Sequence, residues 1–164
     1  MVLLAMKLTL MVLLVLSGIN KSLIMTDPLT TLVGKSFGIA VTAYNGKYRR
    51  DGTTPYIKHP MAVADRVIKY GYEYVCVAYL HDVLEDTNVT YDILIEKGIP
   101  ENIVKAVEIL TKGEGQNYDE YLYYVKSNEV AKRVKIADIL SNLADDPTDK
   151  QIIKYAKALT YLMS

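Results

Sequence analysis

Four ionisable side chains lie in otherwise apolar surroundings: His59, the adjacent pair His81 and Asp82, and Asp138. Burying such groups costs several kcal/mol unless they are paired or bind a metal. Two imidazoles and two carboxylates form a mixed nitrogen and oxygen donor set, which suits a divalent ion such as Mn²⁺, Fe²⁺ or Zn²⁺. Such an ion could lower the pKa of a bound water enough to supply hydroxide near neutral pH.

The residue types alone leave a second interpretation open. Core histidines with satisfied hydrogen bonds, together with buried ion pairs, would give the same pattern without a metal. The single cysteine, Cys76, lies in the apolar run 74–80, so we interpret it as a core residue and not a nucleophile. One cysteine can form neither an internal disulfide nor a CxxC motif.

Helices must position these side chains, because from residue 28 onward apolar residues recur at spacings of three and four. No alternating strand pattern is present. Residues 53–59 are predicted to be extended, since residues before Pro55 and Pro60 are disfavoured in helices. The pattern predicts an all-α, compact multi-helix bundle. The predicted helices cover residues 28–45, 60–70, 73–85, 91–97, 100–110, 118–126, 129–143 and 150–162, with Thr90 as an N-cap.

Four collinear segments resemble the hydrolase domain of the RelA/SpoT family, within the HD superfamily of metal-dependent phosphohydrolases. They are residues 49–60 (RRDGTTPYIKHP), 80–87 (LHDVLEDT), 110–112 (LTK) and 134–143 (VKIADILSNL). The likeness covers about residue 28 to the C-terminus. It implies an HD-domain bundle with a central metal site. The implied reaction is hydrolysis of the 3′-pyrophosphate of guanosine 3′,5′-bis(diphosphate), with release of pyrophosphate.

The resemblance also assigns the metal ligands and two catalytic acids. It implies one divalent ion, usually Mn²⁺, held by four side chains: His59, His81, Asp82 and Asp138. Glu85 and Asp86 would orient or deprotonate the attacking water, a task that suits carboxylates set beside a cation. Residues three and four apart share a helix face, so both acids could reach the cavity of the His81–Asp82 pair. Taken alone, they would be an ordinary acidic helix end.

Four further residues are implied contacts to the nucleotide: Arg49, Arg50, Asn142 and Tyr155. Guanidinium groups bind phosphate chains and stack on bases, although a solvent-exposed basic turn would show the same two arginines. Asn142 lies four residues after Asp138 and shares its helix face. The alignment at Tyr155 is loose, so a packing role is an equal alternative. Another group of tyrosines is expected to cover the core or an interface: Tyr118, Tyr121, Tyr123 and Tyr124.

Three positions depart from the family pattern. Ile139 and Ala144 stand where the family usually has basic residues, and Ser141 replaces its usual aromatic or histidine. A pocket with fewer cations should hold a highly charged alarmone less tightly. Two alternatives therefore stay open: hydrolysis of another nucleotide, such as a nucleoside monophosphate or the 2′-phosphate of NADPH, and a degenerate HD domain that senses nucleotides. The complete ligand set beside Glu85 and Asp86 favours an enzyme. Synthetase activity is not expected.

The overall charge points to a small-molecule partner. Nineteen basic residues balance 19 acidic residues, so no global field would attract nucleic acid or an anionic membrane. A helical DNA-binding module would need a basic recognition helix, which is missing. We expect a nucleotide substrate, no nucleic acid and no stable membrane partner. The sequence leaves the oligomeric state open.

Residues 1–24 form an apolar extension, predicted to be separate from a hydrolase domain at 25–164. The apolar core after Lys7 is about nine residues long, too short for the ~20 that span a bilayer but suitable for a secretory signal. The cleavage site around Ser17 is poor. Translation from Met25, a membrane anchor and an extra packed helix are the other interpretations. A cytoplasmic location is expected if the extension is dispensable.

Overall fold

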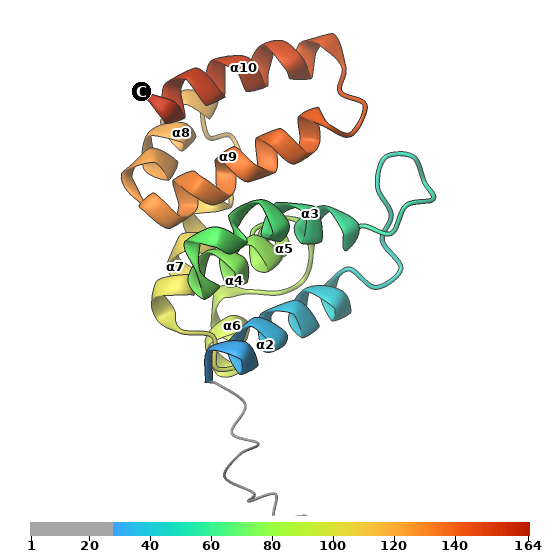
Figure 1. Cartoon of the computed structure of the whole chain (residues 1–164), viewed down its shortest axis with the longest axis vertical. Coiled ribbons are helices and arrows are strands. Elements are labelled where there is room, and N and C mark those ends of the chain that lie inside the picture. The colour runs from blue at the N-terminus through green and yellow to red at the C-terminus, as the bar shows by residue number, and fades with distance from the viewer. Residues whose placement is uncertain (1–27) are drawn as a thin grey trace, which may run out of the picture. The chain divides into compact units, whose positions relative to one another are not determined.

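The computed structural model describes residues 28–164, whose regular secondary structure is helical apart from one isolated β-bridge between Tyr48 and Pro55 (Figure 1). This confirms the predicted all-α class. The helices are α2 (Pro28–Ala43), α3 (Lys58–Val67), the 3₁₀ helix η2 (Ile68–Tyr70), α4 (Tyr72–Leu80), α5 (Val83–Asp86), α6 (Tyr91–Glu96), α7 (Glu101–Leu110), α8 (Tyr118–Ser127), α9 (Glu129–Leu143) and α10 (Asp149–Met163). The apolar extension 1–24 and the start at Met25 lie outside the described residues.

Helix α9 is the central element of the bundle. Helices α3, α4, α7, α8 and α10 all pack against it, and Figure 1 shows it between α10 and the α3–α4 pair. Its buried positions include Ala131, Val134 and Ile139 as well as the ionisable Asp138. The covered side of a helix is normally apolar, so the buried Asp138 is an exception on α9. Because α9 is the central helix, the side chain of Asp138 lies near the centre of the domain.

Helix ends follow the residues that cap them. Asn117 and Asn128 accept backbone N–H groups at the starts of α8 and α9, and Thr90 does so for α6 as expected. Thr148 forms a capping box with Gln151 at the start of α10. Such caps satisfy amides that the first helical turn leaves without partners. They explain why predicted and observed ends agree within a residue or two for these helices.

The segment before α3 differs from the extended stretch predicted for residues 53–59. Lys58 and His59 already belong to α3, and Pro60 lies in its first turn. A proline is tolerated there because the first amides of a helix have no intrahelical acceptor to lose. His59 is consequently held by a helix, with its side chain buried.

The helix predicted over residues 73–85 is divided in two. Helix α4 ends at Leu80, His81 and Asp82 form a turn, and α5 follows from Val83. His81 Nδ1 lies 2.7 Å from the carbonyl oxygen of Ala78, which would accept the amide of Asp82 in an uninterrupted helix. The side chain of His81 competes for this acceptor, and the interruption falls at the pair singled out for chemistry.

Cys76 is fully buried in the core, as predicted, together with Val77, Ala78 and Leu80 of the same helix. No helix within residues 28–164 is long and apolar enough to cross a membrane.

Candidate metal centre and active site

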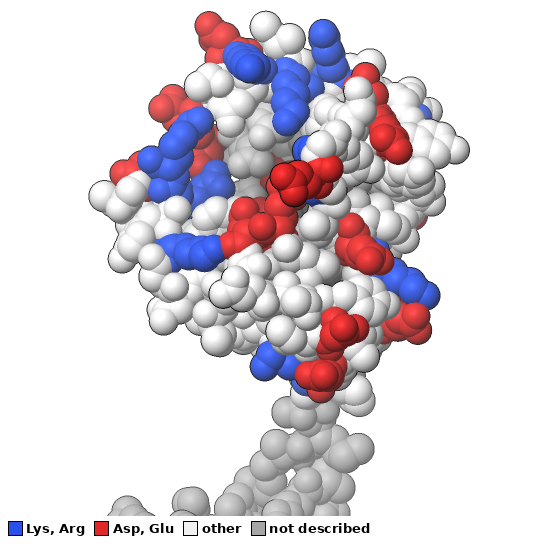
Figure 2. Space-filling view, turned by 180° about the vertical axis from the view of Figure 1, so that it is seen from behind, with Lys and Arg blue, Asp and Glu red and all other residues white. Residues whose placement is uncertain are grey.

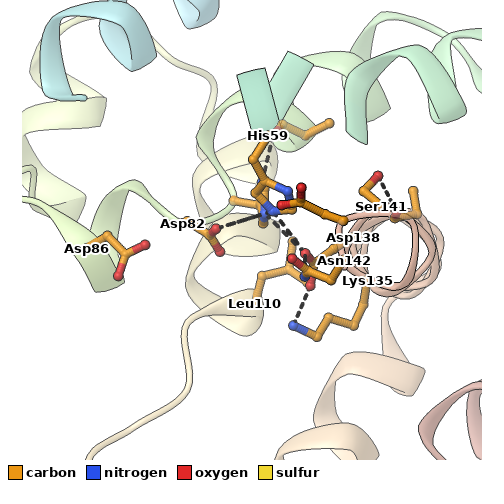
Figure 3. Close-up of polar contacts among 12 residues, drawn as sticks. His59, Asp82, Asp86, Leu110, Lys135, Asp138, Ser141 and Asn142 are labelled. Carbon is orange, nitrogen blue, oxygen red and sulfur yellow. Dashed lines mark hydrogen bonds and ion pairs between the residues drawn. The ribbon is translucent and has the colours of Figure 1, made fainter. Parts of the chain in front are cut away.

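Three elements bring the four predicted ligands together. His59 comes from α3, His81 and Asp82 from the turn after α4, and Asp138 from α9. His59 Nε2 lies 3.1 Å from Asp138 Oδ1 and 3.7 Å from Asp82 Oδ2, while His81 Nε2 lies 3.1 Å from Asp82 Oδ2. Figure 3 shows the side chains of His59, Asp82 and Asp138 turned toward one another. The four side chains thus converge where α3, α4 and α9 pack against one another.

The spacing of these atoms suits one metal ion. Donor atoms of His59, His81 and Asp138 all lie within 4.8 Å of one another, and all three side chains are buried. Ligands bound at about 2.0–2.2 Å from an ion are separated by up to twice that distance. Asp82 Oδ2 lies close enough to both imidazoles to be a fourth ligand. The four roles remain predictions, and the geometry is compatible with each.

The protonation of His81 gives an independent test of this fit. Because Ala78 O can only accept, His81 Nδ1 carries the proton, and the Nε2 of a neutral ring presents its lone pair to the carboxylates. That buried Nε2 has no hydrogen-bond partner among the described residues. A lone pair facing carboxylates is unfavourable unless a proton or a cation lies between them.

The electrostatics of the cluster lead to the same conclusion. Burial lowers the pKa of His81, but Asp82 and Asp138 raise it to about 10. A proton therefore occupies Nε2 unless a metal replaces it, which is the exchange that metal binding to histidine entails. The donor set and the orphaned nitrogen fit a divalent ion.

Lys135 is a part of the site that the sequence reasoning missed. Its Nζ lies 2.8 Å from Asp138 Oδ2, one turn earlier on α9. Burial opposes the charges of this pair, yet Lys135 and the two imidazoles hold the pKa of Asp138 well below its usual range. Asp138 is thus kept as a carboxylate with one oxygen toward Lys135 and the other toward the histidines. The i, i+3 spacing was visible in the sequence, but a lysine on a helix is usually solvated.

Replacing Lys135 by methionine should test this ion pair. Removing one partner of a buried pair typically costs about 3–5 kcal/mol, so we expect a loss of that size in the free energy of unfolding of metal-free protein. The loss should be smaller when Mn²⁺ is present, because a bound metal ion would balance part of the negative charge of Asp138 in place of Lys135. Urea unfolding with and without Mn²⁺ would measure both.

The matched control is Lys132→Met on the same helix. Lys132 pairs with Glu129 at 2.6 Å, and because this pair is more exposed than the Lys135–Asp138 pair, it should contribute less than about 1 kcal/mol. Equal losses for the two variants, or a loss at Lys135 unaffected by Mn²⁺, would contradict the assigned role of Lys135.

A cavity of about 230 Å³, called here the site cavity, opens at the metal ligands. His59, Asp82 and Asp138 line it together with both predicted catalytic acids, Glu85 and Asp86. In Figure 3 Asp86 lies apart from the His59–Asp138 cluster, with Asp82 between them. The interrupted helix therefore still places the acids on the cavity wall, one turn beyond the ligands.

The two acids are held by different partners. Glu85 Oε2 accepts the backbone N–H of Lys112 at 3.2 Å, from the loop after α7. Asp86 Oδ2 lies 2.7 Å from the hydroxyl of Tyr56, which also lies 2.8 Å from Asp82 Oδ2. Tyr56, within the PYIKHP segment, was not assigned a role from the sequence. It links the predicted ligand Asp82 to the predicted catalytic acid Asp86 and fixes their relative positions.

Cationic side chains line the rest of the site cavity. Lys112, Lys135 and Lys154 all border it, and burial together with the other two cations lowers the pKa of Lys154. Figure 2 shows a face on which acidic side chains gather beside a hollow that also has basic side chains at its edge. Acids beside a metal site and cations around them would suit a phosphorylated ligand.

The four predicted nucleotide contacts lie in three different places. Asn142 and Tyr155 line the site cavity, and Asn142 Nδ2 donates to Asp138 Oδ1 at 2.7 Å. Arg49 lines a neighbouring cavity of about 340 Å³, the arginine cavity, which shares His59 with the first. Arg50 lines neither and instead binds the Asp146 carbonyl and the Gln151 side chain. The substrate-binding roles of all four stay predictions.

Arg49 is connected to the ligands through Asn142. Its Nη2 lies 3.2 Å from Asn142 Oδ1 and 2.5 Å from Asp145 Oδ2. The residues of the arginine cavity that the sequence reasoning missed are Lys58 and Arg66. Neither could be placed there from spacing, because the cavity forms only where α3 packs on α9.

The departures from the family pattern have distinct structural positions. Ile139 is fully buried and faces the core, whereas Ala144 lines the arginine cavity. Ser141 is buried and accepts a hydrogen bond from Arg66 Nε at 2.9 Å. Ala144 supplies no cation to the arginine cavity, but three other residues do: Arg49, Lys58 and Arg66.

The tyrosines of α8 do not behave as one group. Tyr121 is buried and its hydroxyl donates to Leu110 O, which confirms a core role. Tyr123 and Tyr124 are exposed. Tyr118 lines the site cavity, and its buried hydroxyl has no hydrogen-bond partner among residues 28–164. The prediction that these rings cover the core or an interface is confirmed for the core at Tyr121 and at Tyr118, which is partly buried against the core as well as bordering the cavity.

Comparisons with known proteins agree with this geometry. No protein-family model matches the chain. The chain is 31% identical over 109 residues to a guanosine-3′,5′-bis(diphosphate) 3′-pyrophosphohydrolase of Aquifex aeolicus, covering 60% of this chain and 16% of that protein. It is 30% identical over 111 residues to the guanosine-3′,5′-bis(diphosphate) 3′-pyrophosphohydrolase MESH1 of Danio rerio, covering 62% of this chain and 61% of that protein.

A solved structure shares the fold. It is a metazoan orthologue of SpoT, described as hydrolysing ppGpp, and it superimposes with a TM-score of 0.67 at 23% identity over 84% of this chain and 87% of that one. The likeness shows that the two proteins share a fold, and in this chain the clustered His59, His81 and Asp138 could hold a metal ion within it. The relatives are named as guanosine-3′,5′-bis(diphosphate) 3′-pyrophosphohydrolases, so the domain is similar to hydrolases of the RelA/SpoT type. The chain spans only 16–18% of the length of the first bacterial relatives that it matches.

Proposed function

We propose that this domain is a metal-dependent phosphohydrolase that removes the 3′-pyrophosphate of guanosine 3′,5′-bis(diphosphate). The observation that carries the proposal is the convergence of His59, His81 and Asp138 within 4.8 Å, at a cavity lined by Glu85 and Asp86. The choice of guanosine 3′,5′-bis(diphosphate) as the substrate is supported by the similarity of the chain to hydrolases of this compound. The proposed ion is Mn²⁺, bound by His59, His81, Asp82 and Asp138. A divalent ion in this position would lower the pKa of water and polarise a phosphoryl oxygen.

The reaction needs a proton acceptor and a correctly placed phosphate. Water oxygen forms a bond to the phosphorus attached to ribose O3′, the O3′–P bond breaks, and pyrophosphate leaves. Glu85 and Asp86 are the proposed acceptors of the water proton, because they are the carboxylates on the cavity wall beyond the ligand cluster. Lys112 N–H and Tyr56 OH keep these acids in place. The proton that O3′ gains comes from solvent or from the same acids.

The two cavities offer cations for two diphosphate groups. In the site cavity Lys112, Lys135 and Lys154 would neutralise the 3′-pyrophosphate, and in the arginine cavity Arg49, Lys58 and Arg66 would face the 5′-diphosphate. Their shared residue, His59, lies between the groups. In this proposal, cations from α3 and α10 would take the place of the basic residues that the family usually has at Ile139 and Ala144.

The test is release of pyrophosphate from guanosine 3′,5′-bis(diphosphate) by purified protein, with and without Mn²⁺. We expect release that depends on Mn²⁺, and no phosphate release from nucleoside mono- or triphosphates under the same conditions. A failure to turn over any member of a broad nucleotide panel, by protein shown to contain metal and to be folded, would refute the hydrolase.

A second candidate is hydrolysis of a nucleotide with fewer phosphates, such as a nucleoside monophosphate or the 2′-phosphate of NADPH. The observation in its favour is that Arg49 and Arg50 already bind groups of the protein, namely Asp145 and the Asp146 carbonyl. Phosphate release from these substrates in the same panel would favour this candidate and leave the metal chemistry unchanged.

The two arginines provide a prediction with an internal control. Arg49→Ala should raise the KM for the alarmone by about tenfold or more, because a hydrogen bond to a charged group contributes roughly 1.5–3 kcal/mol. Arg50→Ala should change KM less than about twofold, since Arg50 borders neither cavity. Steady-state pyrophosphate release would measure both. A larger effect at Arg50 would show that the nucleotide binds elsewhere.

A further inference from the structure

The departing ribose oxygen of the proposed reaction needs a proton. When the O3′–P bond breaks, O3′ leaves as the oxygen of a secondary alcohol, which is too basic to depart as an alkoxide near neutral pH. Solvent and the acids Glu85 and Asp86 are two sources of this proton. The acids must first take a proton from the attacking water, so a separate donor would allow both transfers in one step.

Three cationic side chains border the site cavity: Lys112, Lys135 and Lys154. Two of them already bind groups of the protein. Lys112 Nζ donates to the carbonyl oxygens of Gly113 and Gln116 at 3.2 and 3.0 Å. Lys135 Nζ lies 2.8 Å from Asp138 Oδ2. The N–H groups of these two ammonium groups are therefore directed in part away from a ligand.

Lys154 is the cation of the three whose protons are free. Within residues 28–164 its Nζ forms no hydrogen bond and no ion pair. It lies 4.1 Å from the centre of the Tyr118 ring and 5.8 Å from that of Tyr155, and both rings line the site cavity. Aromatic faces attract an ammonium group but take no proton from it. The rings thus hold the amine at the cavity wall and leave N–H groups for a ligand.

The surroundings of Lys154 favour release of a proton. The charged and titratable groups that face its amine are Lys112, Lys135, Asp138, Glu85, Tyr118 and Tyr155. Partial burial lowers the pKa of Lys154, and the two lysines lower it further, whereas the two carboxylates oppose this. A general acid works best when its pKa lies near the working pH, and the usual lysine pKa of about 10.4 is too high for this. Lys154 is also exposed, so solvent can restore its proton.

We propose that Lys154 is the general acid of the reaction and gives a proton from Nζ to O3′ as the O3′–P bond breaks. The inference rests on the proposed function and assigns separate groups to its two proton transfers. Glu85 or Asp86 takes a proton from the attacking water, pyrophosphate and the 3′-hydroxyl product leave, and the neutral amine of Lys154 regains a proton from solvent. This role goes beyond neutralising the 3′-pyrophosphate, because it requires a proton that is released and not only a charge.

The first experiment measures the amine without turnover. The full chain is treated with acetic anhydride over a range of pH, and mass spectrometry follows the acetylation of each lysine. Because only the neutral amine reacts, we expect half-maximal acetylation of Lys154 at a lower pH than that of Lys157. Lys157 is an exposed lysine of the same helix that does not line the site cavity. A Lys154 that reacts like Lys157 would be too basic for this role and would overturn the assignment.

The second experiment removes the need for the proton. In an alarmone analogue with sulfur in place of O3′, the thiolate can leave unprotonated, because thiols are far more acidic than alcohols. Lys154→Met should lower kcat for the alarmone by about 10²–10⁴-fold and leave kcat for the sulfur analogue close to that of wild type. Lys157→Met is the matched control and should keep both rates. Equal losses on the two compounds would show that Lys154 supplies only charge, and an unchanged alarmone rate would show that another group donates the proton.

The pH dependence of wild type gives a third readout. Since the acid acts in its protonated form, alarmone hydrolysis should decline as the pH rises through the pKa of Lys154, and hydrolysis of the sulfur analogue should lack this decline. A decline shared by both compounds would contradict the role of Lys154. Failure of wild type to cleave either compound would refute the hydrolase, whereas full activity in Lys154→Met would refute only the general acid. Mn²⁺ content and circular dichroism verify that each variant binds metal and is folded.

Discussion

His81→Ala should abolish metal binding and metal-dependent hydrolysis together. His81 Nε2 is buried, lacks a hydrogen-bond partner among the described residues and faces Asp82 at 3.1 Å. Loss of a residue that only hydrogen-bonds to a metal ligand typically weakens metal binding by about 10–100-fold. Removal of a ligand itself should therefore weaken the affinity for the metal by ~100-fold or more. Metal content after dialysis and isothermal titration with Mn²⁺ would measure the change, and pyrophosphate release would follow it.

The control for this variant is Cys76→Ala, a buried residue of the preceding helix that lies in the core and outside both cavities. It should keep full metal content. Asp138 needs a different variant, because Asp138→Ala would leave the buried Lys135 without its counter-ion and could unfold the domain. Asp138→Asn keeps the shape and an acceptor oxygen and should still lose the metal. Full metal content in a folded His81→Ala or Asp138→Asn protein would contradict the ligand assignment.

The sequence predicted where the helices lie, but it did not predict the interruption within the segment 73–85. Helix 129–143 was predicted with the bounds that the structure gives, since Asn128 caps it and Leu143 ends its apolar pattern. The segment 73–85 is also rich in apolar residues, yet the helix is interrupted at His81. The cause is a side-chain contact to Ala78 O. The spacing of apolar residues indicates which positions are buried. It does not indicate where a side chain competes with a backbone N–H for a carbonyl oxygen.

Histidines and aspartates in apolar helices drew attention to the predicted ligands, and the resemblance to RelA/SpoT hydrolase domains then assigned their roles. The residues around them could not be found in this way. Lys154 reaches the site cavity only because α10 packs on α9, and Tyr118 only because α8 does. A lysine or tyrosine on an amphipathic helix is ordinary in any sequence. Lys135 is the exception, since its spacing of three from Asp138 places both on one face of α9.

Glu85→Gln should lower kcat while leaving the metal bound. Glutamine keeps the size of glutamate and can still accept the N–H of Lys112, which now bonds to Glu85 Oε2 at 3.2 Å. It cannot accept a proton from water at neutral pH. General acid–base catalysis contributes about 10²–10⁴-fold, and we expect a loss of kcat in that range with KM and Mn²⁺ content close to wild type. Single-turnover pyrophosphate release would separate the chemical step from product release.

Asp86→Asn distinguishes the two acids. Asp86 accepts from Tyr56, whose hydroxyl also contacts the predicted ligand Asp82, so its replacement should disturb metal binding as well as kcat. Glu85 has no such connection to the ligands. If Glu85 is the proton acceptor, Glu85→Gln shows the larger loss of kcat at saturating Mn²⁺, and part of the Asp86→Asn defect is rescued by more Mn²⁺. If kcat survives in Glu85→Gln and is lost in metal-saturated Asp86→Asn, the proton acceptor is Asp86. Activity retained in both variants would leave neither carboxylate with a catalytic role, because no other acid outside the proposed ligand set lines the site cavity among the described residues.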